Sequence, residues 1–254
     1  MSEVNVPARR YHSPRRKEQA AATREAVLVA ARELFVGEGY RATTVAGIAR
    51  RAGVAVDTIY ATIGRKPDLM REVVETAISG TGQAVPAEQR DYVIRLREAS
   101  GAARKISIYA HALAGIQPRL APVYLALRDA AGNDPDCAAL WTEISERRAA
   151  NMLKFVEDLA ATGELRTDRP AAELADVVWS MNGPEYWVLL VGQRGWAPGQ
   201  FAEWLADAWC RLLLLAGGRP GGCPAARNRR GQGGRPGWPA YHGRGSPDVA
   251  PSAR

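Results

Sequence analysis

The sequence has few of the residues on which most catalytic and metal sites depend. It contains three histidines and three cysteines, the cysteines being Cys137, Cys210 and Cys223. Cysteines that are odd in number and far apart indicate neither a disulfide framework nor a zinc site. There is no GxSxG, P-loop or HExxH motif, and the glycine pairs after Gly217 follow no predicted strand. We therefore expect no enzyme, metal or cofactor, with an enzyme built on the isolated His111 as the weaker alternative.

Long apolar runs are also absent. The most apolar stretches, near residues 187–191 and 212–216, are much shorter than the roughly 20 residues that a membrane-spanning helix needs. The basic N-terminus is not followed by the apolar segment of a secretory signal. The unpaired cysteines fit a reducing compartment. The sequence therefore predicts a cytoplasmic protein that does not enter a membrane.

No segment alternates polar and apolar residues for long, so strands are not expected. The interior is rich in Ala, Leu, Arg and Glu, which favour helices, whereas Gly and Pro punctuate it. The expected class is all-α. Helices are predicted over about 18–36, 87–99, 102–116, 119–131, 135–161, 170–193 and 198–216, with breaks that include one at Pro118 and a kink or split at Pro184.

The net charge of +7 is distributed unevenly. Residues 1–78 have a balance of +4, with a basic cluster at Arg15, Arg16 and Lys17, and residues 217–254 have a balance of +6. Residues 79–216 have a balance of −3, which does not suit a surface that binds phosphate. The basic ends fit a nucleic-acid partner, and a general nucleic-acid binder remains an alternative that a specificity ratio near one would favour.

The most informative stretch is residues 43–63, which predicts two short helices joined by a tight turn. Thr43 or Thr44 can cap the first helix, in which Val45, Ile48, Ala49 and Ala52 form one apolar stripe. Gly53 supplies the turn, and a second helix over about 55–63 buries Ile59 and Ile63. This is the layout of a DNA-reading helix-turn-helix, although an ordinary helical hairpin has the same spacing.

The residues around this motif closely resemble the DNA-binding domain of the tetracycline-repressor (TetR) family of bacterial transcriptional regulators. The resemblance covers about residues 20–80 and rests on Ala31, Phe35, Gly39, Tyr40, Thr43, Thr44, Val45, Ile48, Ala49, Ala52, Gly53, Val54, Thr58, Ile59, Tyr60, Lys66 and Leu69. It implies an N-terminal three-helix DNA-binding domain over 18–80 and a larger helical effector-binding and dimerisation domain over 81–216. By composition, residues 1–17 are a basic disordered arm and 217–254 a disordered Gly/Pro/Arg-rich tail, which either adds non-specific affinity for nucleic acid or has no role.

DNA contacts are expected from both helices of the motif. The phosphate candidates are Thr43, Thr44, Tyr60 and Lys66, and the base-reading candidates are Ala55, Val56, Asp57, Thr58 and Ala61. The reading helix has no Arg, Asn or Gln, so bidentate contacts to guanine or adenine are not expected from it. Val56 and Ala61 suit thymine methyl groups, while Asp57 either accepts from a cytosine amino group or stabilises the start of its own helix.

The second domain is expected to bind a small-molecule effector and a second subunit. Five of the seven tryptophans lie between residues 179 and 209, which indicates large apolar faces. These either pack within one subunit or, as the resemblance implies, form a homodimer interface over about 170–216. Candidate effector contacts are Tyr109, His111, Trp141, Phe155, Trp179 and Tyr186, each of which also suits ordinary core packing. The resemblance thus implies a regulator, usually a repressor, that an effector releases from a palindromic operator in double-stranded DNA.

Overall fold

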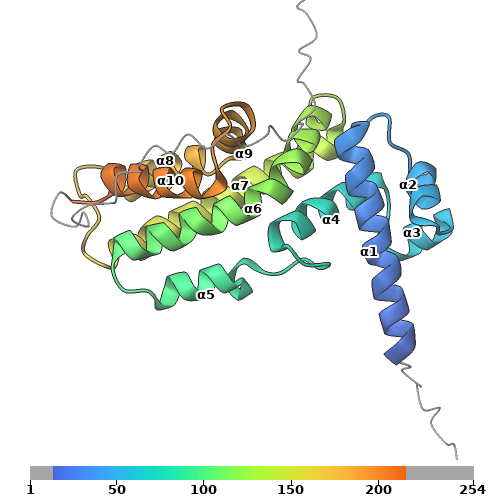
Figure 1. Ribbon diagram of the computed structural model, residues 1–254, viewed down its shortest axis with the longest axis horizontal. Helices are drawn as coiled ribbons and strands as arrows, with labels where there is room; N and C mark the ends of the chain where they lie inside the picture. The colour runs from blue at the N-terminus through green and yellow to red at the C-terminus, as the bar shows by residue number, and fades with distance from the viewer. Residues whose placement is uncertain (1–13, 216–254) are drawn as a thin grey trace, which may run out of the picture.

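The computed structural model describes residues 14–215, and this part of the chain is helical throughout (Figure 1). Its only β pairing is an isolated bridge between Leu165 and Leu214. The prediction of an all-α fold is therefore confirmed. The predicted tail over 217–254 lies outside the described residues, as does most of the predicted arm over 1–17, whose last residues already belong to the first helix.

Four helices form the N-terminal head at one end of the molecule (Figure 1). They are α1 (Pro14–Gly37), α2 (Val45–Ala52), α3 (Val56–Thr62) and α4 (Lys66–Ser79). The core of the head is apolar and closely packed, and its fully buried side chains include Phe35, Ile48, Ile59, Leu69 and Met70. The rings of Phe35 and Tyr40 lie 5.5 Å apart, and Tyr40 is part of this core.

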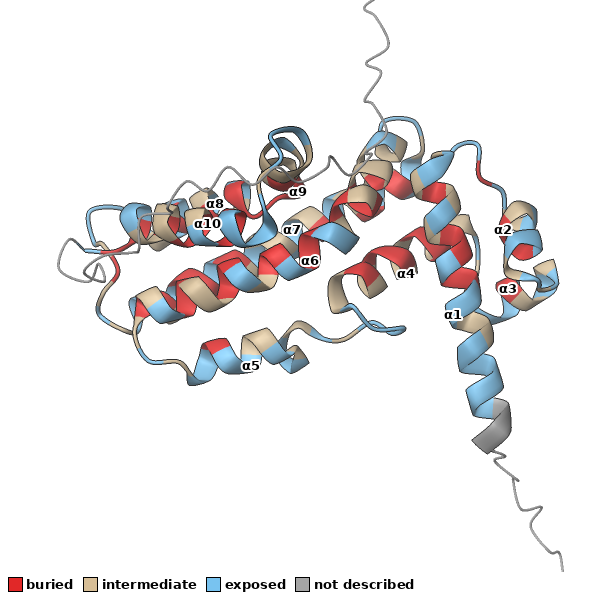
Figure 2. Ribbon diagram, viewed as in Figure 1, coloured by how far each residue is buried: buried red, intermediate tan, exposed pale blue. Residues whose placement is uncertain are grey.

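The remaining helices form an elongated body. They are η1 (Ala87–Gln89), α5 (Asp91–Glu98), α6 (Ala102–Ala131), α7 (Pro135–Ala160), α8 (Ala171–Met181), α9 (Pro184–Trp187), the π-helical η2 (Val188–Gln193) and α10 (Pro198–Leu213). α6 runs along the middle and packs against α7 and α10, while α8 packs on α7 (Figure 1). Buried residues follow the inward faces of these long helices (Figure 2).

The predicted helix break at Pro118 is wrong, because α6 continues for 30 residues through Pro118 and Pro122. Each proline removes only one backbone N–H, and the buried neighbours Ala121 and Val123 hold this part of the helix in the core. The guanidinium of Arg119 also donates to the carbonyls of Gly115 and Ala77, at 2.8 and 3.3 Å. The predicted split at Pro184 is confirmed, since α8 ends at Met181 and α9 begins at Pro184.

Two hydrophobic cores lie along the molecule, and the head does not build its core alone. The core of the head includes the end of α6, through Val123, Tyr124 and Leu127, and the start of α7, through Cys137, Leu140 and Ile144. The second core joins α5 and the other parts of α6 and α7 to α8, α9 and α10. Because α6 and α7 contribute side chains to both cores, a displacement of either helix in the body also shifts side chains in the core of the head.

Candidate nucleic-acid interface

The turn between α2 and α3 has the geometry that the sequence predicts. Thr44 caps α2, since its hydroxyl oxygen accepts a hydrogen bond from the backbone N–H of Gly47 at 3.0 Å. α2 ends at Gly53, whose φ of 69° lies in the left-handed region that favours glycine. Ala49 is 2% exposed at the approach of the two helices. The small side chain at this position lets α3 pack closely on α2.

The outer face of α3 is formed by Asp57, Tyr60 and Ala61, with Ala55 exposed at its N-cap. Tyr60 is 51% exposed, so its ring and hydroxyl are available to a partner. Val56 and Thr58 are only partly exposed, and Val56 packs against the core. The predicted base-reading residue Val56 is therefore only partly available at the surface, because its apolar side chain helps to seat the start of α3.

Thr43 does not fit its predicted role as a phosphate contact. Its side chain is 1% exposed, and its hydroxyl donates to the carbonyl of Gly39 at 2.8 Å. The threonine therefore closes the turn that leads into α2. Thr44 is exposed, and because its oxygen acts only as an acceptor within the cap, its hydroxyl hydrogen can still be donated to a phosphate.

The basic surface extends beyond the predicted residues to Arg41 and Arg65, near helix starts, and to Arg50 in the last turn of α2. Arg41, Arg50 and Arg65 are exposed, and none has a carboxylate within 4.0 Å in the part of the chain that the structure describes. Arg51 differs, because it is paired with Glu33 at 2.7 Å. The sequence contains a signal for Arg41 and Arg65, since both lie within three residues of a predicted helix start, where phosphates bind favourably.

Lys66 lies at the first turn of α4, beside the head's core. Its ammonium is 4.1 Å from the centroid of the Tyr40 ring, and partial burial lowers the pKa of Lys66. The cation therefore has a partner inside the protein as well as a position suited to a phosphate. A contact with the Tyr40 ring and a contact with a DNA phosphate predict different effects of removing the lysine.

Replacing Lys66 with alanine is expected to reduce the salt dependence of DNA binding, because one fewer counterion is released on binding. The slope of log affinity against log salt should decrease by about one unit. The exposed Lys154 of α7 provides a matched control, and Lys154→Ala should leave the slope unchanged. A normal slope combined with lower thermal stability would instead show that Lys66 only supports the Tyr40 ring.

Burial shifts the acid–base behaviour of the contact between the head and the start of α7. Cys137 is fully buried there, and burial raises the pKa of its thiol from 9.0 to about 11. Burial and the hydrogen bond with Cys137 also raise the pKa of Tyr40. Both groups are thus held in their neutral forms where α7 meets the head.

This shift predicts a loss of stability at alkaline pH. Below pH 9 the thiol is protonated in both states, whereas between pH 9 and 11 the unfolded chain releases the proton that the folded chain keeps. The free energy of unfolding should therefore fall by about 1.4 kcal/mol per pH unit in this window. Urea titrations from pH 8 to 10 measure how the free energy of unfolding changes with pH. This change should be smaller for Cys137→Ala than for the parent, and equal changes in both proteins would contradict the prediction.

The six predicted effector contacts do not share one site. Tyr109 and Phe155 are buried in the second core, their rings 5.0 Å apart, and Trp179 and Tyr186 pack at its margin. His111 is exposed and lies 3.2 Å from Glu203, so it lies outside the second core. Trp141 instead packs on Tyr124 in the core of the head, 4.6 Å between centroids, and is also excluded from a site in the second core.

The centre of the second core is a hydrogen-bonded cluster around Asn182, which the sequence prediction missed. The amide of Asn182 donates to the Tyr109 hydroxyl at 3.0 Å and to the sulfur of Met152 at 2.9 Å. Its side-chain oxygen accepts from Arg148 at 2.5 Å, and its backbone carbonyl accepts from Gln117 at 3.0 Å. The only sequence signal was the Asn-Gly-Pro interruption, which marks a helix break where polar backbone groups become available.

Arg148 connects this cluster to the head. It donates to the Tyr124 hydroxyl at 2.9 Å, and Tyr124 belongs to the core of the head. On the same helix, Glu143 forms a two-point ion pair with Arg71 of α4, at 2.5 and 2.7 Å, and Arg147 pairs with Glu75 of α4. Polar side chains of α7 thus contact both Asn182 and α4.

Residues 14–215 contain no group of three or more His, Cys, Asp or Glu side chains placed to hold a metal ion. No helix in this range is long and apolar enough to cross a membrane.

Comparison with known proteins shows that the head matches a family model. Residues 27–73 match the family model described as bacterial regulatory proteins, tetR family. No curated protein matches the chain. Among solved structures, NalD, the secondary repressor of the MexAB-OprM multidrug efflux pump in Pseudomonas aeruginosa, is 20% identical, with 78% of this chain and 98% of NalD covered and a TM-score of 0.59.

Two further structures have the same fold. A regulator assigned to the TetR family from Mesorhizobium loti is 19% identical, with 78% of this chain and 99% of that chain covered and a TM-score of 0.57. SmeT, solved as a complex with triclosan, is 17% identical, with 80% and 98% covered and a TM-score of 0.57. The fold of the body, as well as that of the head, is therefore shared with known regulators.

Proposed function

Because the chain belongs to the TetR family of bacterial transcriptional regulators, it is a DNA-binding regulator, and we propose that it represses transcription from a palindromic operator until a small-molecule effector releases it. The observation that carries the proposal is the capped α2–Gly53–α3 unit, which presents Asp57, Tyr60 and Ala61 at the outer end of the molecule. An ordinary helical hairpin would bury this face.

The proposed DNA contacts are of two kinds: contacts to phosphates position the protein, and contacts to base edges read the sequence. Thr44, Lys66 and the exposed Arg41, Arg50 and Arg65 suit phosphates on either side of the groove. Ala55 and Ala61 suit thymine methyl groups, and Asp57 suits a cytosine amino group. With few polar side chains on α3, sequence-dependent DNA shape contributes to specificity.

A homodimer would place two heads on one operator. Three of the large exposed apolar side chains, Leu189, Leu212 and Leu215, lie within or next to the predicted interface over 170–216. The same range contains the partly exposed Trp204, whose ring centroid lies 6.0 Å from that of Tyr186 and 5.9 Å from that of Trp196. Exposed apolar groups of this kind favour a second subunit as their cover. A two-fold dimer would read half-sites about one helical turn apart, roughly 34 to 36 Å.

Release would follow from a change in the second core. A ligand near Asn182 and Tyr109 that favours another arrangement of α6 and α7 would move the surfaces that these helices contribute to the head. The ion pairs between α7 and α4 would transmit the same displacement. The ligand then shifts the population of dimers away from the spacing that fits the operator. SmeT was solved with triclosan, which supports a small organic molecule as the effector class.

Selection of bound sequences from a random DNA pool with the purified full-length chain tests this proposal. We expect a palindromic consensus, and we expect that random competitor DNA will not displace it at comparable concentration. A pool that remains random, with a specificity ratio near one, would identify a general nucleic-acid binder and overturn the proposal. A consensus with a single half-site would retain the DNA-reading role and remove the dimer.

A further inference from the structure

The second core contains a guanidinium without a counter-ion. Arg148 is partly buried, and each of its hydrogen-bond acceptors is neutral: the Tyr124 hydroxyl, the backbone carbonyl of Trp179 and the amide oxygen of Asn182. Its guanidinium carbon lies 5.5 and 5.6 Å from the ring centroids of Tyr124 and Trp179. No carboxylate comes within 4.0 Å of it in residues 14–215. Withdrawing a cation from water in this way is costly unless an anion pairs with it.

A second arginine without a carboxylate partner is close in the chain to Tyr92, whose ring centroid lies 6.0 Å from that of Tyr109. Arg90, at the N-cap of α5, donates to the carbonyl of Val85 at 3.1 Å and likewise has no carboxylate within 4.0 Å among the described side chains. Burial, with a contribution from Tyr92, raises the pKa of Tyr109, and the charges of Arg148 and Arg90 act in the opposite direction. Both positive charges therefore favour a negative charge near Tyr109.

The surrounding core has more hydrogen-bond donors than acceptors left without a partner. The indole nitrogens of Trp179, Trp187 and Trp209 are buried and unpaired, and the only unpaired acceptor in this core is the side-chain oxygen of Gln117. The Trp209 ring stacks on Tyr109 with centroids 5.5 Å apart. Because an unpaired buried donor destabilises the protein, these groups favour a ligand that carries acceptors.

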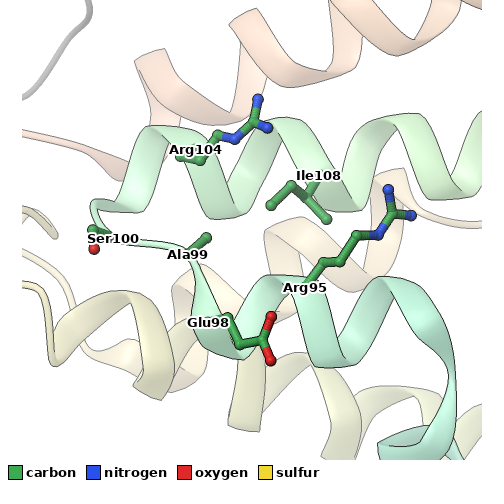
Figure 3. A pocket seen from close by; sticks show the side chains of 6 residues that line it. All are labelled: Arg95, Glu98, Ala99, Ser100, Arg104 and Ile108. Carbon is green, nitrogen blue, oxygen red and sulfur yellow. The ribbon is translucent and has the colours of Figure 1, made fainter.

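The helix α5 borders a hollow at the surface of the body. This helix buries one residue, Leu96, and packs mainly on α6, so few apolar contacts hold it in place. A hollow of about 360 Å³ opens between the two helices, and its walls include Arg95, Arg104 and Ile108 (Figure 3). Residues 90–105 contain five basic and two acidic side chains, whereas the balance over 79–216 is −3. Two arginines and one glutamate, Glu98, thus line the hollow, which gives it a small positive excess on a negative domain and favours anions.

From these contacts we infer that the effector is an organic acid with an apolar body, whose carboxylate pairs with Arg148 and Arg90 near Tyr109. The inference rests on the proposed function, since it names the chemical class of the effector. The acid supplies the counter-ion that both arginines lack, and its oxygens accept from the unpaired indoles. Phe155, Met152 and Met181 provide adaptable apolar surface for the body of the ligand.

Binding of matched compounds to the full-length protein without DNA tests this class. Decanoate, decanol and decylamine share one skeleton, and 2-naphthoate, 2-naphthalenemethanol and 2-naphthalenemethylamine share another. We expect an acid to raise the melting temperature and quench tryptophan fluorescence, with the matched alcohol and amine about tenfold weaker or more. If neither acid binds, or if the alcohol or amine binds as tightly, the inference is wrong.

Variants that remove one positive charge test where the carboxylate of the ligand binds. Arg148→Gln is expected to reduce the preference for acid over alcohol about tenfold, whereas Lys154→Gln, which removes the same charge from the exposed face of α7, should leave it unchanged. Because the acid and the matched alcohol share one skeleton, a general loosening of the core weakens both and leaves the ratio of their affinities unchanged. Arg90→Gln provides a second test in case Arg148→Gln folds poorly. If the ratio of acid affinity to alcohol affinity is unchanged in Arg90→Gln and in folded Arg148→Gln, the carboxylate does not pair with these arginines. Binding is measured without DNA, so its failure leaves operator selection standing.

Discussion

Replacing Ala49 with leucine is expected to remove most operator binding while the body of the protein stays folded. Ala49 is 2% exposed where α2 meets α3, and the backbone carbonyl of Ala49 accepts from Val54 at 3.0 Å across the turn. A leucine adds three carbon atoms to this packed contact, which costs about 1 to 3 kcal/mol and pushes α3 away from α2. The loss of two base contacts would weaken operator binding about a hundredfold.

The comparison uses Ala26→Leu, which adds the same atoms to the exposed face of α1. Its free energy of unfolding should change by no more than about 0.5 kcal/mol, and its operator affinity should stay near that of the parent. Operator affinity is measured on the selected sequence and on random DNA, because displacement of α3 should reduce specific binding much more than non-specific binding. Parent-like operator affinity in Ala49→Leu would show that α3 does not depend on close packing against α2.

The sequence specified the head well because its signals are local. The cap at Thr44, the left-handed turn at Gly53 and the buried stripe of Ile48 and Ala49 all lie within a few residues of one another. Backbone sterics and helical periodicity determine such features without reference to the rest of the fold. Thr43 shows the limit of this reasoning, since two adjacent threonines are equal as caps and only the structure shows which one faces the core.

Features that depend on distant contacts were not predictable in the same way. Pro118 normally ends a helix, and the packing of α6 between α7 and α10 overrides that local preference. Trp141 and Cys137 joined the core of the head because the start of α7 returns to it, which no local pattern indicates. The isolated position of His111 likewise gave no sign that its face of α6 is exposed.

Asn182 shows how a helix break creates a buried polar centre. α8 ends at Met181 and Pro184 begins α9, so Asn182 and Gly183 lie in the bend between the two helices. Asn182 is 6% exposed and bonds through both its side chain and its backbone carbonyl. Its contacts reach Tyr109 of the second core and, through Arg148, Tyr124 of the head. The bend is therefore the point at which the two cores are linked by hydrogen bonds.

Replacing Asn182 with leucine is accordingly expected to lower the free energy of unfolding by about 3 kcal/mol, because it removes the amide contacts of Arg148 and Tyr109 and leaves a buried charge underbonded. Asn133→Leu, at an exposed position in the turn between α6 and α7, should change it by no more than about 0.5 kcal/mol. Urea titration at one protein concentration measures both, since the stability of a dimer depends on concentration. Equal effects of the two variants would show that the cluster contributes no more than a surface contact.

Asn182→Asp separates the structural role of this residue from the charge of the site. The aspartate keeps an oxygen toward Arg148 and adds the counter-ion that the guanidinium lacks, so it should retain more stability than Asn182→Leu. The same carboxylate competes with an acidic ligand for Arg148, and binding of decanoate or 2-naphthoate should therefore weaken about tenfold or more while binding of the matched alcohol persists. If Asn182→Asp binds the acid as tightly as the parent does, Arg148 is not the partner of the carboxylate, and the positive charge of the core serves the fold alone.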